Sequence, residues 1–156
     1  AHFVLGNMFL HGRGVPQDDA QAAKHFWTAA DKGHAWAKVQ LGWMYENGRG
    51  VEQDFEEAKA WYERAMKKGH SAAYHYLAAL YLSGKGVKKD EAQAFKLYLT
   101  GAEKGFALSQ NQVGTMYERG VGTRRDKDEA VRWYMQAARS GQKDAQERLK
   151  QLNVQR

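Results

Sequence analysis

The chain has 156 residues, of which 43% are hydrophobic, 27% are charged and one is proline, a composition typical of a folded helical domain. It has no cysteine, which excludes disulfides and thiolate sites, and no apolar run nears the roughly 20 residues of a membrane span, so we expect no membrane insertion. The net charge of +6 permits an acidic partner. Because the chain opens at Ala1 within a helical pattern, we interpret it as a processed or excised piece of a longer protein.

An internal repeat of 36 residues organises the chain. A leucine or valine followed by a small residue recurs without insertion at Leu5, Leu41, Leu77 and Val113. Each copy continues with an aromatic residue, a Gly-x-Gly loop, an aspartate, a run of alanines and aromatics, and a closing glycine. The copies cover about residues 1–34, 35–70, 71–106 and 107–142.

Each copy is predicted to form two helices, called here A and B. In the second copy the apolar residues of 35–47 recur with the period of one helix face, and Gly48 is suited to end that helix in the left-handed conformation. Asp54 is predicted to cap helix B. The small Gly42 on helix A, and Ala58 and Ala65 on helix B, are expected to mark places where helices approach closely and leave room for large aromatic residues between them.

A fifth helix of the A type is predicted at about residues 143–152. It has apolar residues at Ala145, Leu149 and Leu152 with charges between them. Because a two-helix unit cannot cover its own apolar face, we interpret this helix as a C-terminal cap on the stack. The prediction is an all-α solenoid forming a single domain over residues 1–156.

The second copy carries a motif that identifies a family. It contains Leu41-Gly42, Tyr45, the Gly48-x-Gly50-Val51 loop, Asp54, Ala58, Trp61-Tyr62, Ala65 and Gly69 at fixed spacing. This pattern closely resembles the Sel-one-like repeat, a relative of the tetratricopeptide repeat, over essentially the whole chain. The resemblance implies a right-handed superhelix with A helices along its concave side. It also implies an adaptor or scaffold without catalytic activity or cofactor, either in bacterial envelope, secretion, host-interaction or signalling complexes or in eukaryotic endoplasmic-reticulum quality control. Of these, the resemblance favours a bacterial protein with an extracytoplasmic location.

Residues that the repeat does not require are the candidates for binding. Positions two before and two after the repeat leucine are expected to point away from the core, because each lies roughly 160° to 200° around the helix. The predicted partner-binding residues on or near this face are Phe3, Trp36, Val39, Trp43, His75 and Tyr76. Exposed aromatic residues are typical of surfaces that bind a protein or a peptide. The alternative is that these side chains pack between neighbouring A helices.

Other functions are less well supported by the residues. Arg13, Arg49 and Lys85 share one loop position, so a basic ridge suited to an acidic partner is expected there, although simple solvent exposure of the turn explains these residues better. RNA binding is an alternative function, which the helical repeats, basic charge and aromatic residues fit only loosely. Ser140 and Lys143 match a Ser-x-x-Lys pattern, which leaves a β-lactam or ester hydrolase as a third hypothesis. The histidines show no spacing typical of a metal site, and neither the partner nor the oligomeric state can be read from the sequence.

Overall fold

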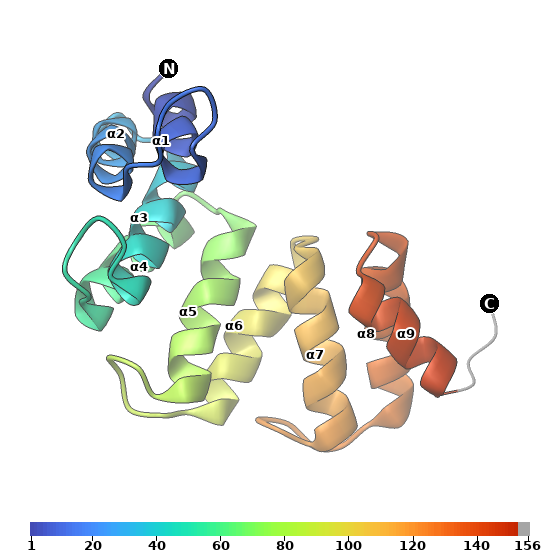
Figure 1. Cartoon of the computed structure of the whole chain (residues 1–156). Helices are drawn as coiled ribbons and strands as arrows, with labels where there is room; N and C mark the ends of the chain where they lie inside the picture. Colours follow the sequence, from blue (N-terminus) through green and yellow to red (C-terminus); the bar gives the residue numbers. More distant parts are fainter. Residues whose placement is uncertain (153–156) are drawn as a thin grey trace. The chain divides into compact units, whose positions relative to one another are not determined.

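The computed structural model describes residues 1–152, which form helices joined by short turns and contain no strand (Figure 1). The helices are α1 (His2–His11), α2 (Asp19–Asp31), α3 (Ala35–Asn47), α4 (Phe55–Lys67), α5 (Ser71–Ser83), α6 (Glu91–Glu103), α7 (Ala107–Arg119), α8 (Lys127–Arg139) and α9 (Lys143–Gln151). The odd-numbered helices are the A helices of the repeat and the even-numbered helices are the B helices. The prediction of an all-α repeat solenoid is therefore confirmed.

The chain divides into two compact units, and the boundary between them along the sequence falls within α5. Unit 1 covers Ala1–Ala73 and unit 2 begins at Tyr74. In unit 1, consecutive helices from α1 to α4 pack against one another, and in unit 2 the same holds from α6 to α9. Within each unit, every helix therefore buries an apolar face against its neighbours in the chain, as expected for a repeat protein.

The helix ends follow from local chemistry. Each B helix begins after an aspartate whose side chain accepts a hydrogen bond from a backbone N–H of the first turn; these are Asp18, Asp54, Asp90 and Asp126. The A helices α3 and α7 end at Gly48 and Gly120, which have φ values of 62° and 69°. A residue with a Cβ rarely adopts this conformation, which is why the repeat has glycine here. The predicted end of helix A at Gly48 and the predicted cap of helix B by Asp54 are both confirmed.

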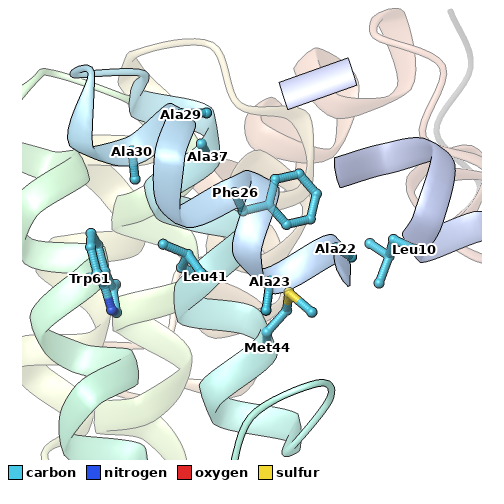
Figure 2. Close-up of a cluster of buried hydrophobic side chains, with 10 residues drawn as sticks. All are labelled: Leu10, Ala22, Ala23, Phe26, Ala29, Ala30, Ala37, Leu41, Met44 and Trp61. Atoms are coloured by element: carbon cyan, nitrogen blue, oxygen red, sulfur yellow. The ribbon is translucent and has the colours of Figure 1, made fainter. Parts of the chain in front are cut away.

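The core of unit 1 lies between its A and B helices (Figure 2). Phe26, Leu41 and Met44 are fully buried there, and Trp61 is 3% exposed. Gly42 lets α3 and α4 approach, because a Cβ at this position would lie only 2.4 Å from the ring of Tyr62. The predicted close approach of helices at Gly42 is confirmed, and the structure identifies Tyr62 as the aromatic residue that occupies this place.

The core of unit 2 repeats this arrangement and extends into α9. Tyr134 on α8 is 2% exposed, and a Cβ added to Gly114 would lie 2.8 Å from its ring. Helix α9 packs against α8 and contributes Ala145 and Leu149, which are 0% and 3% exposed. The predicted fifth helix is therefore present and covers the apolar face of α8.

The second glycine of the Gly-x-Gly loop has a role that the sequence prediction did not include. Gly50 has a φ of 72°, which suits the predicted chain reversal. In addition, a Cβ at Gly50 would lie 2.1 Å from the carbonyl oxygen of Asp19, and one at Gly122 would lie 2.2 Å from that of Glu91. Both loops therefore contact the first turn of the preceding B helix, and only glycine allows so close an approach.

Candidate functional site on the A helices

The predicted aromatic stripe of α3 is only partly on the surface. Val39 is 2% exposed, so the expectation that its side chain lies on an accessible face is wrong. A helix inside a stack of repeats is covered by its neighbours on more than one face, so a position opposite the core of its own repeat can still be buried. Val39 therefore belongs to the packing, while Trp36 and Trp43 on the same helix remain half-buried.

Phe3 and Trp36 stack on the residues that precede the following A helices. The ring of Phe3 lies 4.4 Å from that of His34, and the ring of Trp36 lies 4.9 Å from that of His70. His34 also caps α3, since its Nδ1 accepts a hydrogen bond from the backbone N–H of Ala37. These contacts favour the alternative that aromatic residues join neighbouring repeats, although both rings keep an exposed part.

Trp43 is held at the surface of unit 1. One part of its ring packs against the core, and the guanidinium of Arg49 lies 5.4 Å from the ring centre. Arg49 in turn donates two hydrogen bonds to the carboxylate of Asp19, at 2.8 and 2.7 Å. The expectation that Arg49 belongs to a free basic ridge is therefore wrong, because this side chain ties the loop to α2 and supports Trp43.

His75 is half-buried within unit 2. Its Nδ1 lies 3.1 Å from the hydroxyl of Ser109, and its ring contacts those of Tyr98 and Phe106 at 5.2 and 5.3 Å. Burial lowers the pKa of His75 to about 4, so the imidazole is neutral at pH 7. Tyr76 meets the edge of His75 at 5.4 Å and is half-buried. His75 thus connects α5, α6 and α7 rather than projecting from them.

A polar hollow of about 330 Å³ lies on the A-helix side of unit 2. It is lined by Asn111, Thr115, Glu118, Arg119, Tyr134, Asp144, Arg148 and Gln151. Asn111 and Thr115 occupy the same repeat positions as Val39 and Trp43, but the sequence prediction favoured aromatic residues and did not include them. The positional rule that selected Trp43 could have found this site if polar side chains had been considered as well.

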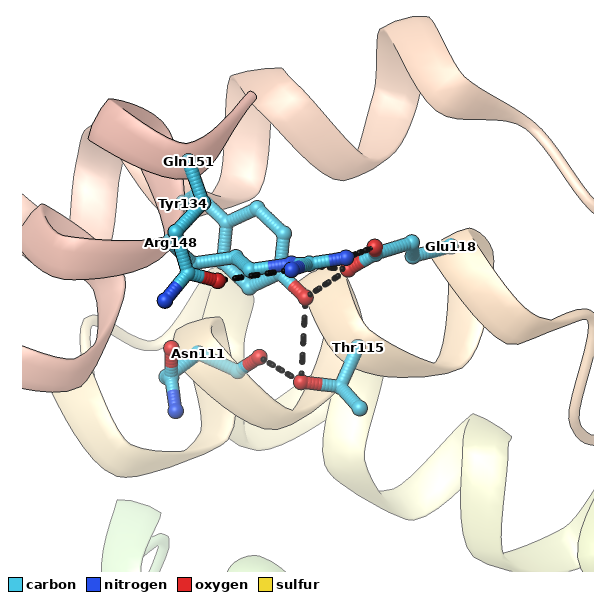
Figure 3. Close-up of polar contacts among 6 residues, drawn as sticks. All are labelled: Asn111, Thr115, Glu118, Tyr134, Arg148 and Gln151. Carbon is cyan, nitrogen blue, oxygen red and sulfur yellow. Dashed lines mark hydrogen bonds and ion pairs between the residues drawn. The ribbon is translucent and has the colours of Figure 1, made fainter. Parts of the chain in front are cut away.

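The wall of this hollow is a connected network of hydrogen bonds (Figure 3). Glu118 on α7 accepts one from the hydroxyl of Tyr134 at 2.7 Å and forms an ion pair with Arg148 on α9. Tyr134 is also 3.2 Å from the hydroxyl of Thr115, and Arg148 donates to the side-chain oxygen of Gln151 at 2.7 Å. Side chains from three helices are therefore held relative to one another by these contacts.

The electrostatics of the network follow from these contacts. The hydrogen bond from Arg148 holds the pKa of Glu118 below its usual value, so this carboxylate is charged at neutral pH. Burial, together with the hydrogen bond to Glu118, raises the pKa of Tyr134 to about 12. The hydroxyl of Tyr134 therefore stays protonated and donates its hydrogen bond to the carboxylate of Glu118. Arg119, which is exposed at the end of α7, lines the hollow as a further cation.

The other chemical hypotheses find little support in the arrangement of side chains. The hydroxyl of Ser140 donates to the backbone carbonyl of Gln136 at 3.4 Å, in an exposed turn. Within residues 1–152, no three histidine, aspartate or glutamate side chains are placed to hold a metal ion. Over the same residues, no helix is both long and apolar enough to cross a membrane.

Comparison with known proteins gives a consistent result. A family model described as Sel1 repeat matches residues 1–34, 37–70, 71–106 and 107–142, which agrees closely with the predicted copies. No curated protein matches the chain.

Solved structures with the same fold come from several bacteria. A Sel1 repeat protein of Oxalobacter formigenes is 34% identical over 92% of this chain, with a TM-score of 0.89. A protective antigen present in uropathogenic Escherichia coli strains is 36% identical over 92% of the chain, with a TM-score of 0.83. Cysteine-rich protein B of Helicobacter pylori, at 20% identity, 79% coverage of this chain and 93% of its own length, and a TM-score of 0.64, shares the fold. The chain spans 57% of the Oxalobacter protein and 31% of the Escherichia coli antigen.

Proposed function

Because the chain belongs to the Sel1 repeat family, whose members generally serve as non-catalytic scaffolds for protein–protein interactions, we propose that it binds a peptide or protein segment on its A helices. The observation that carries this proposal is the polar hollow between α7 and α9. Its fixed network leaves Asn111 and Arg119 on the lining without a role in the ion pair of Glu118. An amide and a guanidinium are well suited to bind the carbonyl and carboxylate groups of a peptide.

In unit 1 we assign the corresponding contact to Trp36 and Trp43. Their exposed parts offer apolar area on the helix whose counterpart in unit 2 lines the hollow. Large, half-buried aromatic side chains held by neighbours contribute strongly to binding because little conformational entropy is lost. Phe3, Val39, His75 and Tyr76, which were predicted as contacts, support the surface by holding the A helices in place.

Capture of the partner from the native lysate tests both parts of the proposal. Two double variants are compared with the unchanged protein: Trp36→Ala with Trp43→Ala, and Asn111→Ala with Arg119→Ala. We expect each to reduce capture at least tenfold while the helical circular dichroism is retained. Arg132→Ala is the matched control, because this arginine is exposed on a B helix. Undiminished capture by both double variants would refute the A-helix surface.

We also propose an extracytoplasmic location. The support is the similarity to a protein described as a protective antigen of Escherichia coli. Fractionation of the native organism, with detection by an antibody against this chain, tests the proposal. Recovery of the protein only with cytoplasmic markers would contradict it.

A further inference from the structure

A second surface of unit 1 lies on the B helices and is separate from the proposed A-helix contacts. Trp27 on α2 is 44% exposed, although it is one of the largest apolar side chains in the protein. Its ring meets that of Trp61 on α4 edge to face, with a centroid distance of 4.7 Å. Trp61 itself is 3% exposed, so it forms a rigid floor beside the exposed ring of Trp27.

A group of three cations includes one that stacks on this tryptophan pair. The guanidinium of Arg64 lies over the ring of Trp61, 4.5 Å from its centre. The ammonium of Lys68 reaches the turn between α2 and α3, since it lies 4.0 Å from the place where a Cβ of Gly33 would stand. Lys38 on α3 lies near both, and burial, followed by repulsion from Lys68 and Arg64, lowers its pKa.

Within residues 1–152, none of these three cations forms an ion pair. Among the described residues, no carboxylate lies within 4.0 Å of the charged nitrogens of Lys38, Arg64 or Lys68. Asp31, one turn after Trp27 on α2, forms no ion pair either. A cluster of like charges beside buried apolar surface is destabilising unless an anion approaches it.

The repeat does not require this arrangement. The positions equivalent to Trp27 hold Glu63, Leu99 and Met135, and those equivalent to Arg64 hold Thr28, Thr100 and Gln136. Packing of B helices is therefore achieved elsewhere in the same chain without an exposed tryptophan or a stacked arginine. Packing of the B helices therefore does not explain the exposed tryptophan and stacked arginine of unit 1, whereas a role in binding does.

We propose that Trp27, Trp61, Lys38, Arg64 and Lys68, called here the basic tryptophan patch, bind an acidic segment of a protein partner. An apolar side chain of that segment packs on the exposed ring of Trp27. Flanking carboxylates pair with Arg64, whose planar guanidinium suits them, and with Lys68. A nucleic acid fits less well, because one exposed ring offers no series of stacking positions along a strand.

A peptide selection tests this proposal. A random 12-residue peptide library displayed on phage is selected on the unchanged protein and counter-selected on the Trp27→Ala variant. We expect the retained peptides to be enriched in aspartate and glutamate around one apolar residue. A synthetic peptide from this set should bind at least tenfold more weakly to the double variant Arg64→Gln with Lys68→Gln, and added salt should weaken its binding.

Matched controls separate the patch from general charge and from the A-helix surface. Lys96→Gln with Lys104→Gln removes two exposed lysines in unit 2, one of them equivalent to Lys68, and should leave affinity unchanged. The variant Trp36→Ala with Trp43→Ala should also bind the peptide normally, because it leaves the basic tryptophan patch unchanged. The basic tryptophan patch is therefore tested independently of the proposed A-helix surface. The indole N–H signals of Trp27 and Trp61 should shift in nuclear magnetic resonance spectra.

Several results would overturn the proposal. They are a selection that returns no binders, binders without acidic enrichment, or peptides that bind the Arg64→Gln with Lys68→Gln variant as well as the unchanged protein. Binding of a 12-nucleotide single-stranded RNA, or of vesicles with an anionic phospholipid, that depends on Trp27 and exceeds peptide affinity would assign the patch to another class of partner. It too would overturn the proposal.

Discussion

At the scale of single residues, His75 shows how a polar side chain can serve packing. It lies among Tyr98, Phe106 and Ser109, and its only polar contact at Nδ1 is the hydroxyl of Ser109. A protonated imidazole in this place would lose its hydration without gaining a carboxylate partner. The side chain therefore connects helices only in its neutral form, which makes the stability of the protein depend on pH.

The sign of this dependence follows from the lowered pKa. In the unfolded chain His75 takes up a proton below its ordinary pKa of 6.5, whereas burial in the folded protein lowers the pKa to about 4. The stability that the neutral imidazole of His75 contributes is thus fully present above pH 6.5. It is lost as the pH falls from 6.5 to 4, and it changes no further below pH 4.

We expect the free energy of unfolding of the unchanged protein to fall between pH 7 and pH 4 by roughly 3 kcal/mol more than that of His75→Gln. Urea titrations at a series of pH values measure it. His11→Gln, at an exposed position, should keep the pH dependence of the unchanged protein. Parallel curves for His75→Gln and the unchanged protein would contradict the assignment.

At the scale of elements, the loop between helices A and B connects neighbouring repeats. Its tip packs on the first turn of the preceding B helix, where Gly50 faces the carbonyl of Asp19 and Arg49 binds the side chain of the same residue. The turn after helix B is different, because Gly69 has a φ of 76° but no atom near its missing Cβ. Both Gly50 and Gly69 have a backbone conformation that favours glycine, but only Gly50 is also in close contact with another helix.

Gly50→Ala and Gly69→Ala form a matched pair for this distinction. Each places an alanine at positive φ, which costs roughly 1 kcal/mol or more. Only Gly50→Ala also drives a Cβ into the backbone of α2, which adds roughly 1–3 kcal/mol. Urea unfolding of both variants measures the difference, and equal losses of stability would show that the loop does not need its close contact.

At the scale of the whole molecule, two compact units are built from one repeated set of contacts. In each, a glycine on an A helix faces a buried tyrosine, Gly42 with Tyr62 in unit 1 and Gly114 with Tyr134 in unit 2. In repeat proteins, stability is close to a sum of repeat and neighbour terms, so local changes act mainly on nearby helices.

Gly42→Ala and Gly114→Ala are the same chemical change at equivalent repeat positions, but each should destabilise a different part of the chain. We expect Gly42→Ala to lower amide protection mainly in α3 and α4, and Gly114→Ala mainly in α7 and α8. Hydrogen exchange followed by mass spectrometry resolves these segments. An equal loss of protection throughout the chain in both variants would indicate a single cooperative unit instead.

The sequence by itself determined the repeats, the helix boundaries and the fold family. Gly48 and Asp54 act on backbone groups a few residues away, so their effects on helix ends are local and readable from order along the chain. A close helix approach at Gly42 could also be predicted, because the 36-residue period repeats small residues at fixed places, whereas its partner Tyr62 was identified only by the structure.

Only the tertiary structure decided which side chains remain at the surface. Val39 and His75 lie on a face that helical geometry places away from the core of their own repeat, yet Val39 is 2% exposed and His75 is half-buried against Tyr98 and Ser109. The hollow formed by Glu118, Tyr134 and Arg148 likewise joins residues of three helices. Exposure and charge pairing depend on which side chains of other repeats arrive at the same place, and a period measured along one chain does not contain that information.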